Sequence, residues 1–420
     1  MNKKWQRIRL KFFSPSARNI LSYRPEGMRY IGLENIESKT GKLLLDNEQV
    51  QVDSAVVFFD DHSVLFGKLR PYLAKVATPD FCGVASTEIM VFEPIDNNNR
   101  QFLAYLLLSD GFIKRVSGMT DGAKMPRANP NDVLNLSLFV PEPTEQRRIA
   151  AYLDEQTAKI DRLMDLRRQQ MALLKEQRAA LIQQAVTRGL NPNVPMKDSG
   201  LPWLGEIPRH WEVKRLKFIT PQVTVGIVIN PSSHYVESGI PCLRSLNIKA
   251  GALVKDELVF INQKSHQLLE KSAIYRGDIV AVRTGQPGTT AVVDEYFHNA
   301  NCIDLIIVRS SSLFVSEYIQ FLLNSNFAKA QFDSDSDGAI QQHFNIQTAK
   351  NLFTLLPPLS EQWMILDFIE GETIKFSKLH SAYSRQLTLL TEYRAALIHE
   401  CVTGQRAVPD NFNPGASEHD

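Results

Sequence analysis

The sequence predicts an α+β protein with an internal pseudo-two-fold repeat, in which two globular domains are joined by two long antiparallel helices that form a coiled coil. Three observations predict this fold. Motifs between residues 122 and 182 recur 216 positions later without a gap, two long stretches hold mostly helix-forming residues, and short apolar runs with turn signals precede each stretch. The recurring motifs are Gly122-Ala123, Asn129, Glu145-Gln146 and Arg-Ala-Ala-Leu-Ile at 178–182, matched by Gly338-Ala339, Asn345, Glu361-Gln362 and the same five residues at 394–398.

The composition is that of a folded protein with more than one domain. The chain has 420 residues, of which 44% are hydrophobic and 22% are charged, and its formal net charge is +1. This charge does not by itself indicate a nucleic-acid partner. The first 30 residues, however, carry many Lys and Arg and a single acid, Glu26. That imbalance predicts a local basic face rather than a basic protein.

Cysteine usage and hydropathy bear on the compartment. The 4 cysteines have no paired spacing and no signal peptide is recognisable, so we expect reduced thiols and a cytoplasmic protein. No run approaches the ~20 apolar residues of a membrane helix. We therefore expect no membrane partner.

Residues 1–143 are predicted to form the first globular domain. β-Branched and aromatic residues indicate strands at 51–58 and 87–92, and helix formers indicate a short helix at 101–108. Pro141 and Pro143 then end the domain.

Residues 144–190 are predicted to form the first spacer helix. Thr144 suits the N-cap position, Glu145 suits the positive end of the helix dipole, and no Gly or Pro follows until Gly189. At ~1.5 Å per residue such a helix is roughly 65 Å long, which a compact domain does not produce. An apolar residue at every seventh position predicts a coiled coil. Its seam is interrupted by Arg167 and consists of Leu153, Ile160, Leu174 and Leu181, with Ile369, Phe376, Tyr383, Leu390 and Leu397 in the second copy.

Residues 191–356 are predicted to form a linker and the second globular domain. The linker is rich in Pro and Gly, and we expect it to dock through Trp203 and Trp211. The clearest strands of the domain are at 278–282 and 303–308.

Residues 357–405 are predicted to form the second spacer helix, capped by Ser360 and Glu361, and residues 406–420 a flexible tail. The first helix must leave the first domain and the second helix must leave the second domain. Pairing therefore makes the helices antiparallel and places the domains at opposite ends.

Motifs for catalysis are missing from the sequence. There is no G-x-G-x-x-G or Walker A segment, no Asn/Asp-Pro-Pro-aromatic loop of an adenine methyltransferase, and no zinc spacing among the His and Cys residues. The sequence thus predicts no catalytic and no metal-binding residues. It favours a recognition or scaffold subunit.

Several motifs resemble one known family. The segment 201–211 (Leu-Pro-Trp-Leu-Gly-Glu-Ile-Pro-Arg-His-Trp) with Lys-Arg-Leu-Lys at 214–217 is similar to the start of a target recognition domain in specificity (S) subunits of type I restriction-modification systems. Phe-Gly-Lys-Leu-Arg-Pro-Tyr-Leu at 66–73 with Ala-Ser-Thr-Glu at 85–88 resembles the core of that domain, and Pro-Pro-Leu-Ser-Glu-Gln at 357–362 resembles the start of its conserved helix. The second domain departs from the core motif, with Val-Arg-Thr-Gly-Gln-Pro at 282–287.

The resemblance implies a non-catalytic subunit whose two recognition domains each read one half of a bipartite, asymmetric site in double-stranded DNA. The helices would set the spacing and dock two methyltransferase (M) subunits, joined by two restriction/translocase (R) subunits in systems that include them. The chain itself would hold no cofactor, because S-adenosylmethionine, ATP and Mg would lie on the partner subunits. The recognised sequence, the spacer length and the presence of a nuclease subunit stay open.

Two loops in each domain hold side chains suited to DNA contacts. Arg and Lys pair with guanine, Asn and Gln pair with adenine, and phosphates accept bonds from cations and short polar donors. The second loop has a common Asp-Gly-Ala frame, closed by an Asn, around different residues, as two readers of different half-sites would have. The candidates are Lys68, Arg70, Tyr72, Lys124 and Arg127 in the first domain and Arg283, Thr284, Gln286, Gln341, Gln342 and His343 in the second.

The repeated Arg-Ala-Ala-Leu-Ile motif is a candidate for partner docking or for packing between the two helices, since its small residues allow close approach. The residues concerned are Arg178, Leu181, Arg394 and Leu397. For the whole chain, the alternative to DNA recognition is a coiled-coil scaffold or adaptor that binds proteins without DNA.

Overall fold

The computed structural model describes residues 5–17, 19–44, 54–122, 124–228, 231–334 and 344–412, without the side chains of 231 and 332–334. The chain forms two compact units, unit 1 (Met1–Gln169 and Tyr383–Asp420) and unit 2 (Gln170–Ala382). Each unit therefore contains one globular head and one end of each long helix. This division differs from the one drawn from the sequence, in which the helices stand apart from the heads.

Helix α5 spans Pro143–Arg188 and helix α10 spans Leu359–Val402. Helix α5 begins one residue before its predicted start at 144, whereas α10 begins two residues after its predicted start at 357. The predictions that Thr144 and Ser360 are N-caps are wrong, because both lie inside the first turn. Pro143 instead occupies the first helical position, where its fixed φ suits the helix and its missing N–H costs nothing. The glutamate predicted near each helix start does lie in the first turn.

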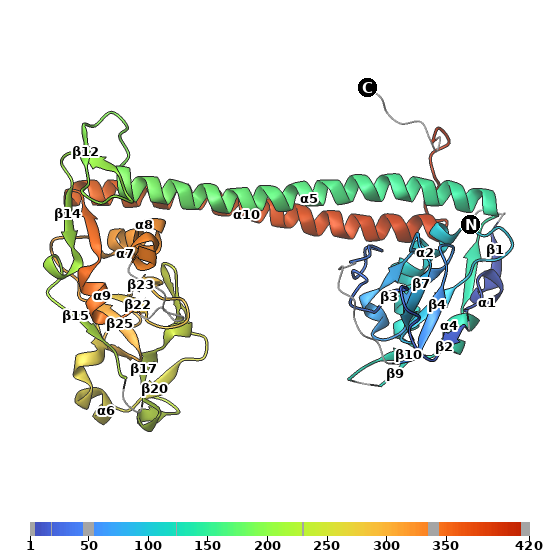
Figure 1. Cartoon of the computed structure of the whole chain (residues 1–420), viewed down its shortest axis with the longest axis horizontal. Coiled ribbons are helices and arrows are strands. Elements are labelled where there is room, and N and C mark those ends of the chain that lie inside the picture. The colour runs from blue at the N-terminus through green and yellow to red at the C-terminus, as the bar shows by residue number, and fades with distance from the viewer. Residues whose placement is uncertain are drawn as a thin grey trace. The chain divides into compact units, whose positions relative to one another are not determined.

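Within each unit, the parts of α5 and α10 that belong to it lie side by side (Figure 1). In unit 1, Asp161 pairs with Arg394 at 3.0 Å and the Arg167 guanidinium lies 5.1 Å from the Tyr383 ring centroid, so the helices run antiparallel there. In unit 2, Arg178 Nε lies 3.4 Å from Thr373 Oγ1. The predicted seam is confirmed, because all of its positions are buried or half-buried, including Arg167, which stacks on Tyr383.

Head one precedes α5 and contains two small sheets covered by helices. Its sheets have the strand orders β2-β4-β7-β3 and β6-β5-β8, and β1 pairs antiparallel with β11. Helix α2 packs on β5 and β6. The elements are β1 Gln6–Arg9, α1 Leu10–Phe13, β2 Ile20–Leu21, β3 Arg29–Ile31, β4 Val56–Phe59, β5 Val64–Gly67, η1 Pro71–Leu73, β6 Val76–Ala77, β7 Gly83–Ser86, β8 Ile89–Phe92, α2 Arg100–Leu108, α3 Asp110–Ser117, β9 Thr120–Asp121, β10 Arg127–Ala128, α4 Pro130–Asn135 and β11 Ser137–Val140.

Head two lies between α5 and α10 in the chain and repeats this arrangement with more strands in its sheets. Their strand orders are β15-β25-β22-β23 and β16-β20-β17-β24-β21. The linker that precedes the head is packed as predicted, with Trp211 fully buried and Trp203 against Phe327. The elements are β12 Met196–Asp198, β13 Glu206–Pro208, β14 Glu212–Arg215, η2 Leu216–Phe218, β15 Val223–Val225, η3 Pro231–His234, β16 Tyr235–Val236, β17 Ile240–Leu243, η4 Ser245–Asn247, β18 Ile248–Lys249, β19 Ala252–Leu253, β20 Val259–Ile261, α6 Gln263–Leu268, η5 Glu270–Ser272, β21 Ala273–Ile274, β22 Ile279–Val282, β23 Thr290–Val292, β24 Ala300–Cys302, β25 Leu305–Val308, α7 Ser316–Asn324, α8 Asn326–Ser334, α9 Ile346–Asn351 and β26 Phe353–Leu356.

The register of equivalent strands reproduces the repeat seen in the sequence. In head one Gln6 pairs with Val140, and in head two Glu212 pairs with Leu356. The first partners differ by 212 − 6 = 206 positions and the second by 356 − 140 = 216. The same strand pair thus closes both heads, and the ten extra residues of head two lie between its ends.

The predicted strands are present but begin later than expected. Strand β8 begins at Ile89 because the two residues before it form the turn from β7. Strand β25 begins at Leu305 because Asp304 has a left-handed backbone, with φ 51°. Strand β4 begins at Val56, and residues 51–53 of the predicted strand lie outside the described residues. The helix predicted at 101–108 is confirmed as α2.

The predicted flexible tail is wrong for residues 406–412, which pack on unit 1. Val408 is 3% exposed, the Phe412 ring lies edge-on 5.3 Å from the Tyr152 ring, and the Arg148 guanidinium donates to the carbonyl oxygens of Val408 and Pro409. This part of the predicted flexible tail is therefore held by helix α5. Residues 413–420 lie outside the described part of the chain.

All 4 cysteines are free thiols, as predicted. Cys82 is exposed, whereas the other three are buried. Burial raises the pKa of Cys242 to about 12, that of Cys401 to about 11 and that of Cys302 well above its usual range. Among the described residues, no helix combines the length and apolar character needed to cross a membrane.

Candidate nucleic-acid interface

The two candidate loops of head one form a single surface. The first follows β5 and the second connects β9 with β10. The Arg70 backbone N–H donates to the Pro126 carbonyl oxygen at 2.7 Å, and the Ala128 N–H donates to the Lys68 carbonyl oxygen at 2.9 Å. The candidates predicted from separate parts of the sequence are thereby brought together in head one.

The exposure of these residues differs. Lys124 and Arg127 are exposed, and so is Tyr72, with 48% of its surface accessible. Lys68 and Arg70 are half-buried. Arg70 has a left-handed backbone, with φ 51°, a conformation that costs of order 1–3 kcal/mol for a residue with a side chain. The backbone hydrogen bond to the Pro126 carbonyl oxygen helps to hold Arg70 in this conformation.

Head two has the same backbone contact with different side chains. The Phe344 N–H donates to the Arg283 carbonyl oxygen at 3.2 Å, which is the equivalent of the bond from Ala128 to Lys68. Thr284 is half-buried and Gln286 is exposed. The candidates Gln341, Gln342 and His343 lie outside the described residues.

A carboxylate that was not among the predicted site residues lies beside the arginine of each loop surface. Glu88 Oε1 pairs with Arg127 Nη2 at 2.7 Å in head one. Asp304 Oδ1 pairs with Arg283 Nη1 at 2.7 Å in head two, and its Oδ2 lies 3.4 Å from Thr284 Oγ1. The two acids are 304 − 88 = 216 positions apart. That spacing was the signal in the sequence that could have identified them.

Each head is fixed to its long helix by a buried glutamine of the repeated Glu-Gln motif. Gln146 is 1% exposed, accepts from the Asn99 backbone N–H at 2.8 Å, and donates to the Pro141 carbonyl oxygen and to Asn98 Oδ1 at 2.9 Å each. In unit 2, fully buried Gln362 likewise accepts from the N–H at the start of α7 and donates to the carbonyl oxygen before the helix. Gln146 thus connects the start of α2 to α5, and Gln362 connects the start of α7 to α10.

Two of the predicted docking residues belong to the interior of unit 1. Leu397 is fully buried in the core that α10 shares with head one, so of the two roles predicted for the motif, docking and packing, it has the packing role. Arg394 is 8% exposed, and its guanidinium pairs with Asp161 and donates to the carbonyl oxygens of Lys39 and Thr40. It ties a head-one loop to both helices, so it too is not available to a partner.

Their equivalents in unit 2 remain more accessible. Arg178 is exposed, and Leu181 is half-buried.

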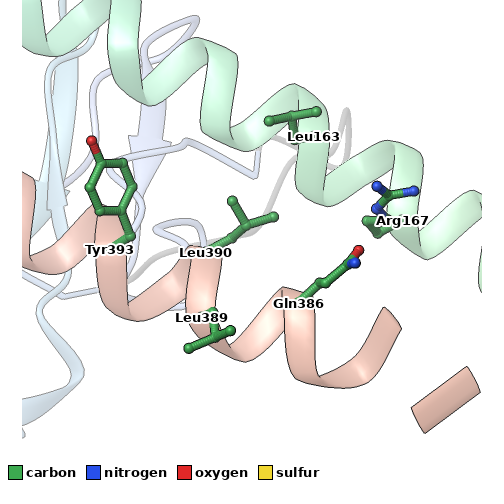
Figure 2. Close-up of a pocket in the computed structure, with 6 residues that line it drawn as sticks. All are labelled: Leu163, Arg167, Gln386, Leu389, Leu390 and Tyr393. Carbon is green, nitrogen blue, oxygen red and sulfur yellow. The ribbon is translucent and has the colours of Figure 1, made fainter. Parts of the chain in front are cut away.

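An apolar groove between the helices of unit 1 is a further exposed feature, lined from α5 by Leu163 and Arg167 (Figure 2). From α10 it is lined by Gln386, Leu389, Leu390 and Tyr393.

Taken together, the described loops present cations, hydroxyl groups and amides at a solvent-facing surface, which suits contacts to phosphates and base edges. Among the described residues, no three His, Cys, Asp or Glu side chains are grouped so that they could hold a metal ion.

Part of the sequence is similar to known proteins. The sequence model of the family described as the type I restriction modification DNA specificity domain matches residues 23–171. The EcoKI specificity subunit of Escherichia coli K12 is 25% identical over 302 residues, which cover 69% of this chain and 60% of that relative. The aligned part thus spans about three-fifths of the length of this curated relative.

The fold is shared with solved structures. A chain from a structure described as the basis of complex assembly and conformational transition of the type I R-M system matches with a TM-score of 0.74 and 19% identity, over 97% of this chain and 99% of that one. The HsdS subunit from Thermoanaerobacter tengcongensis matches with a TM-score of 0.54 and 19% identity, over 97% and 98%.

The class defined by the fold is that of two-headed α+β proteins with paired long helices. More particularly, residues 23–171 match the type I restriction modification DNA specificity domain, and the chain is similar to type I restriction-modification specificity subunits. The resemblance drawn from the sequence motifs is confirmed.

Proposed function

We propose that this chain is the DNA specificity subunit of a type I restriction-modification complex, in which each head reads one half of a bipartite, asymmetric site in double-stranded DNA. The observation that carries the proposal is the loop surface, where the same backbone contact recurs in both heads beneath different side chains. Lys68 in head one corresponds to Arg283 in head two. A common scaffold with different polar residues suits two readers of different half-sites.

The two loops of head one are proposed to combine phosphate contacts with base contacts. Exposed Lys124 and Tyr72 suit the backbone of the duplex, whereas Arg127 is held in a fixed position and suits a base edge. In head two, Arg283, Thr284 and Gln286 take the corresponding place. The candidates Gln341, Gln342 and His343 remain part of this proposal from the sequence.

The helices are proposed to set the spacing between the half-sites and to dock two methyltransferase subunits. Arg178 and Leu181 remain candidates for this docking, since the structure leaves them exposed and half-buried. Two restriction/translocase subunits would join in systems that have them. The chain itself is proposed to be non-catalytic and to act in the cytoplasm, with S-adenosylmethionine, ATP and Mg on its partners.

Binding to duplex DNA across a salt series tests this proposal. If about four cations of a head contact phosphates, log K falls with log salt at a slope of about −3.6, so affinity drops on the order of 10²-fold between about 50 and 200 mM salt. The assay is a gel shift of genomic DNA fragments with the full chain. Absence of binding, or binding that is indifferent to salt, would support the alternative of a protein-binding coiled-coil scaffold.

A further inference from the structure

Glu88 and Asp304 occupy equivalent positions, yet each pairs with an arginine from a different loop. In head one the arginine is Arg127, on the second loop. In head two it is Arg283, which directly follows β22 on the first loop. The position of the acid is thus retained between the repeats, while the position of its cation is not. An ion pair that served only to stabilise one loop would have no reason to exchange partners in this way.

Each of the two ion pairs contains one polar atom that lacks a hydrogen-bond partner among the described residues. Glu88 Oε2 and Arg283 Nε are both buried and have no hydrogen-bond partner among the residues that the structure describes. A buried polar atom left without a partner is unusual in a native protein and calls for a reason, such as an absent ligand. The unsatisfied atoms belong to the two equivalent pairs, at the surface that we propose faces DNA, and they differ in kind. Arg283 Nε is a donor that a base acceptor can satisfy, whereas Glu88 Oε2 accepts and requires a donor.

The arginine side chains nevertheless reach solvent. The Arg127 side chain is 57% exposed and that of Arg283 is 33% exposed. A guanidinium group has a planar fork of N–H donors, so a carboxylate that binds one edge leaves other N–H groups for a second acceptor. The carboxylate fixes the plane of the fork and therefore the direction in which the remaining donors point.

The paired carboxylate also selects between the possible acceptors on DNA. It offsets the positive charge of the arginine and so weakens its attraction to phosphates. Guanine offers two neutral acceptors, O6 and N7, at the spacing of the arginine fork. By contrast, exposed Lys124 has no ion-pair partner among the described residues and is suited to a phosphate.

We propose that Glu88 and Asp304 are positioning residues that hold the Arg127 and Arg283 guanidinium groups against guanine, one in each half-site. The inference rests on the proposed function and adds a base class to it. Because the two arginines come from different loops, the guanine has a different place in each half-site. The two halves would therefore differ in sequence although the heads share one fold.

A binding selection on randomised duplexes tests this inference. The full chain is incubated with a library of duplexes that carry a randomised central segment, and the bound fraction is sequenced. The wild-type motif is expected to contain at least one guanine in each half. Glu88→Gln should lower the preference for guanine about tenfold at one position of one half, within the range of discrimination of a bidentate contact. Asp304→Asn should do the same in the other half.

Two further variants separate positioning from mere folding. Arg127→Lys keeps the charge but loses the fork, so it should relax the same position as Glu88→Gln. Lys124→Gln removes a charge from the same loop and should lower overall affinity while the motif stays unchanged. Melting temperatures of the variants check that each is folded.

The outcomes are distinct. A half-site without guanine, or a Glu88→Gln motif identical to that of the wild type, overturns the inference while DNA recognition stands. A uniform loss of enrichment at all positions assigns Glu88 a purely structural role and also overturns it. If the wild-type chain selects no sequence at all, the proposed function fails and the inference fails with it.

Discussion

Replacing Gln146 by alanine should loosen the attachment of head one to helix α5. The substitution leaves the Asn99 N–H, the Pro141 carbonyl oxygen and Asn98 Oδ1 without the glutamine. Each buried polar group left unpaired costs about 1–3 kcal/mol. Pro141 is buried, but Asn98 and Asn99 are half-buried and water can partly replace the lost bonds. We therefore expect a loss of about 3 kcal/mol in the free energy of opening at the start of α2.

Hydrogen exchange measured by mass spectrometry is the suitable assay, because a chain of two units is not expected to unfold in a single two-state step. A loss of about 3 kcal/mol corresponds to exchange on the order of 10²-fold faster in the peptide that contains α2. Exposed Gln169 on the same helix supplies the control, since Gln169→Ala should change the rate little. Equal effects of the two substitutions would refute the account of the anchor.

Three further outcomes are expected. Leu397→Ala should lower the free energy of opening of the unit 1 core, measured by hydrogen exchange, by about 2–5 kcal/mol because it opens a core cavity. Leu389→Ala, at a side chain 53% exposed, should change it by less than about 1 kcal/mol. Comparable values for the two variants would contradict the burial of Leu397. Arg394→Ala should speed hydrogen exchange in the loop at 36–44 by at least about tenfold, since Asp161 and two loop carbonyl oxygens lose their donor; an unchanged loop would show that the contact does not hold it. A thiol reagent at neutral pH should modify Cys82 rapidly and the other cysteines only after denaturation, because burial and raised pKa values disfavour their thiolates, and rapid labelling of a second thiol would contradict this burial.

The elements set by local pattern could be predicted from the sequence. The repeat fixes the equivalence of the heads, and the seven-residue spacing of apolar residues predicts which faces of α5 and α10 are buried. The N-caps were placed wrongly because a preceding proline can extend a helix by one residue, a choice that Thr144 alone does not reveal. Strand starts failed where a turn or a left-handed residue, such as Asp304, interrupts an apolar run.

The site was predicted in part. Residue type and the recurrence of the loops in both repeats predicted Lys68, Arg70 and Arg127 as candidates. The structure places them on one surface of head one. The pairings of Glu88 with Arg127 and of Arg394 with Asp161 were not accessible, since the motifs that contain Glu88 and Arg394 do not reveal which distant residues they contact. Arg394 contacts the carbonyl oxygen of Lys39, and only the folded arrangement joins segments so far apart in the chain. For the same reason, the packing of the residues after α10 could not be foreseen.

The central claim is that two unlike heads on one chain read the two halves of one DNA site. The most direct test is to sequence adenine methylation genome-wide in cells that have this chain and in cells that lack it. We expect methylation at a single bipartite, asymmetric motif that disappears with the chain. A methylation pattern that stays the same without the chain would contradict the claim.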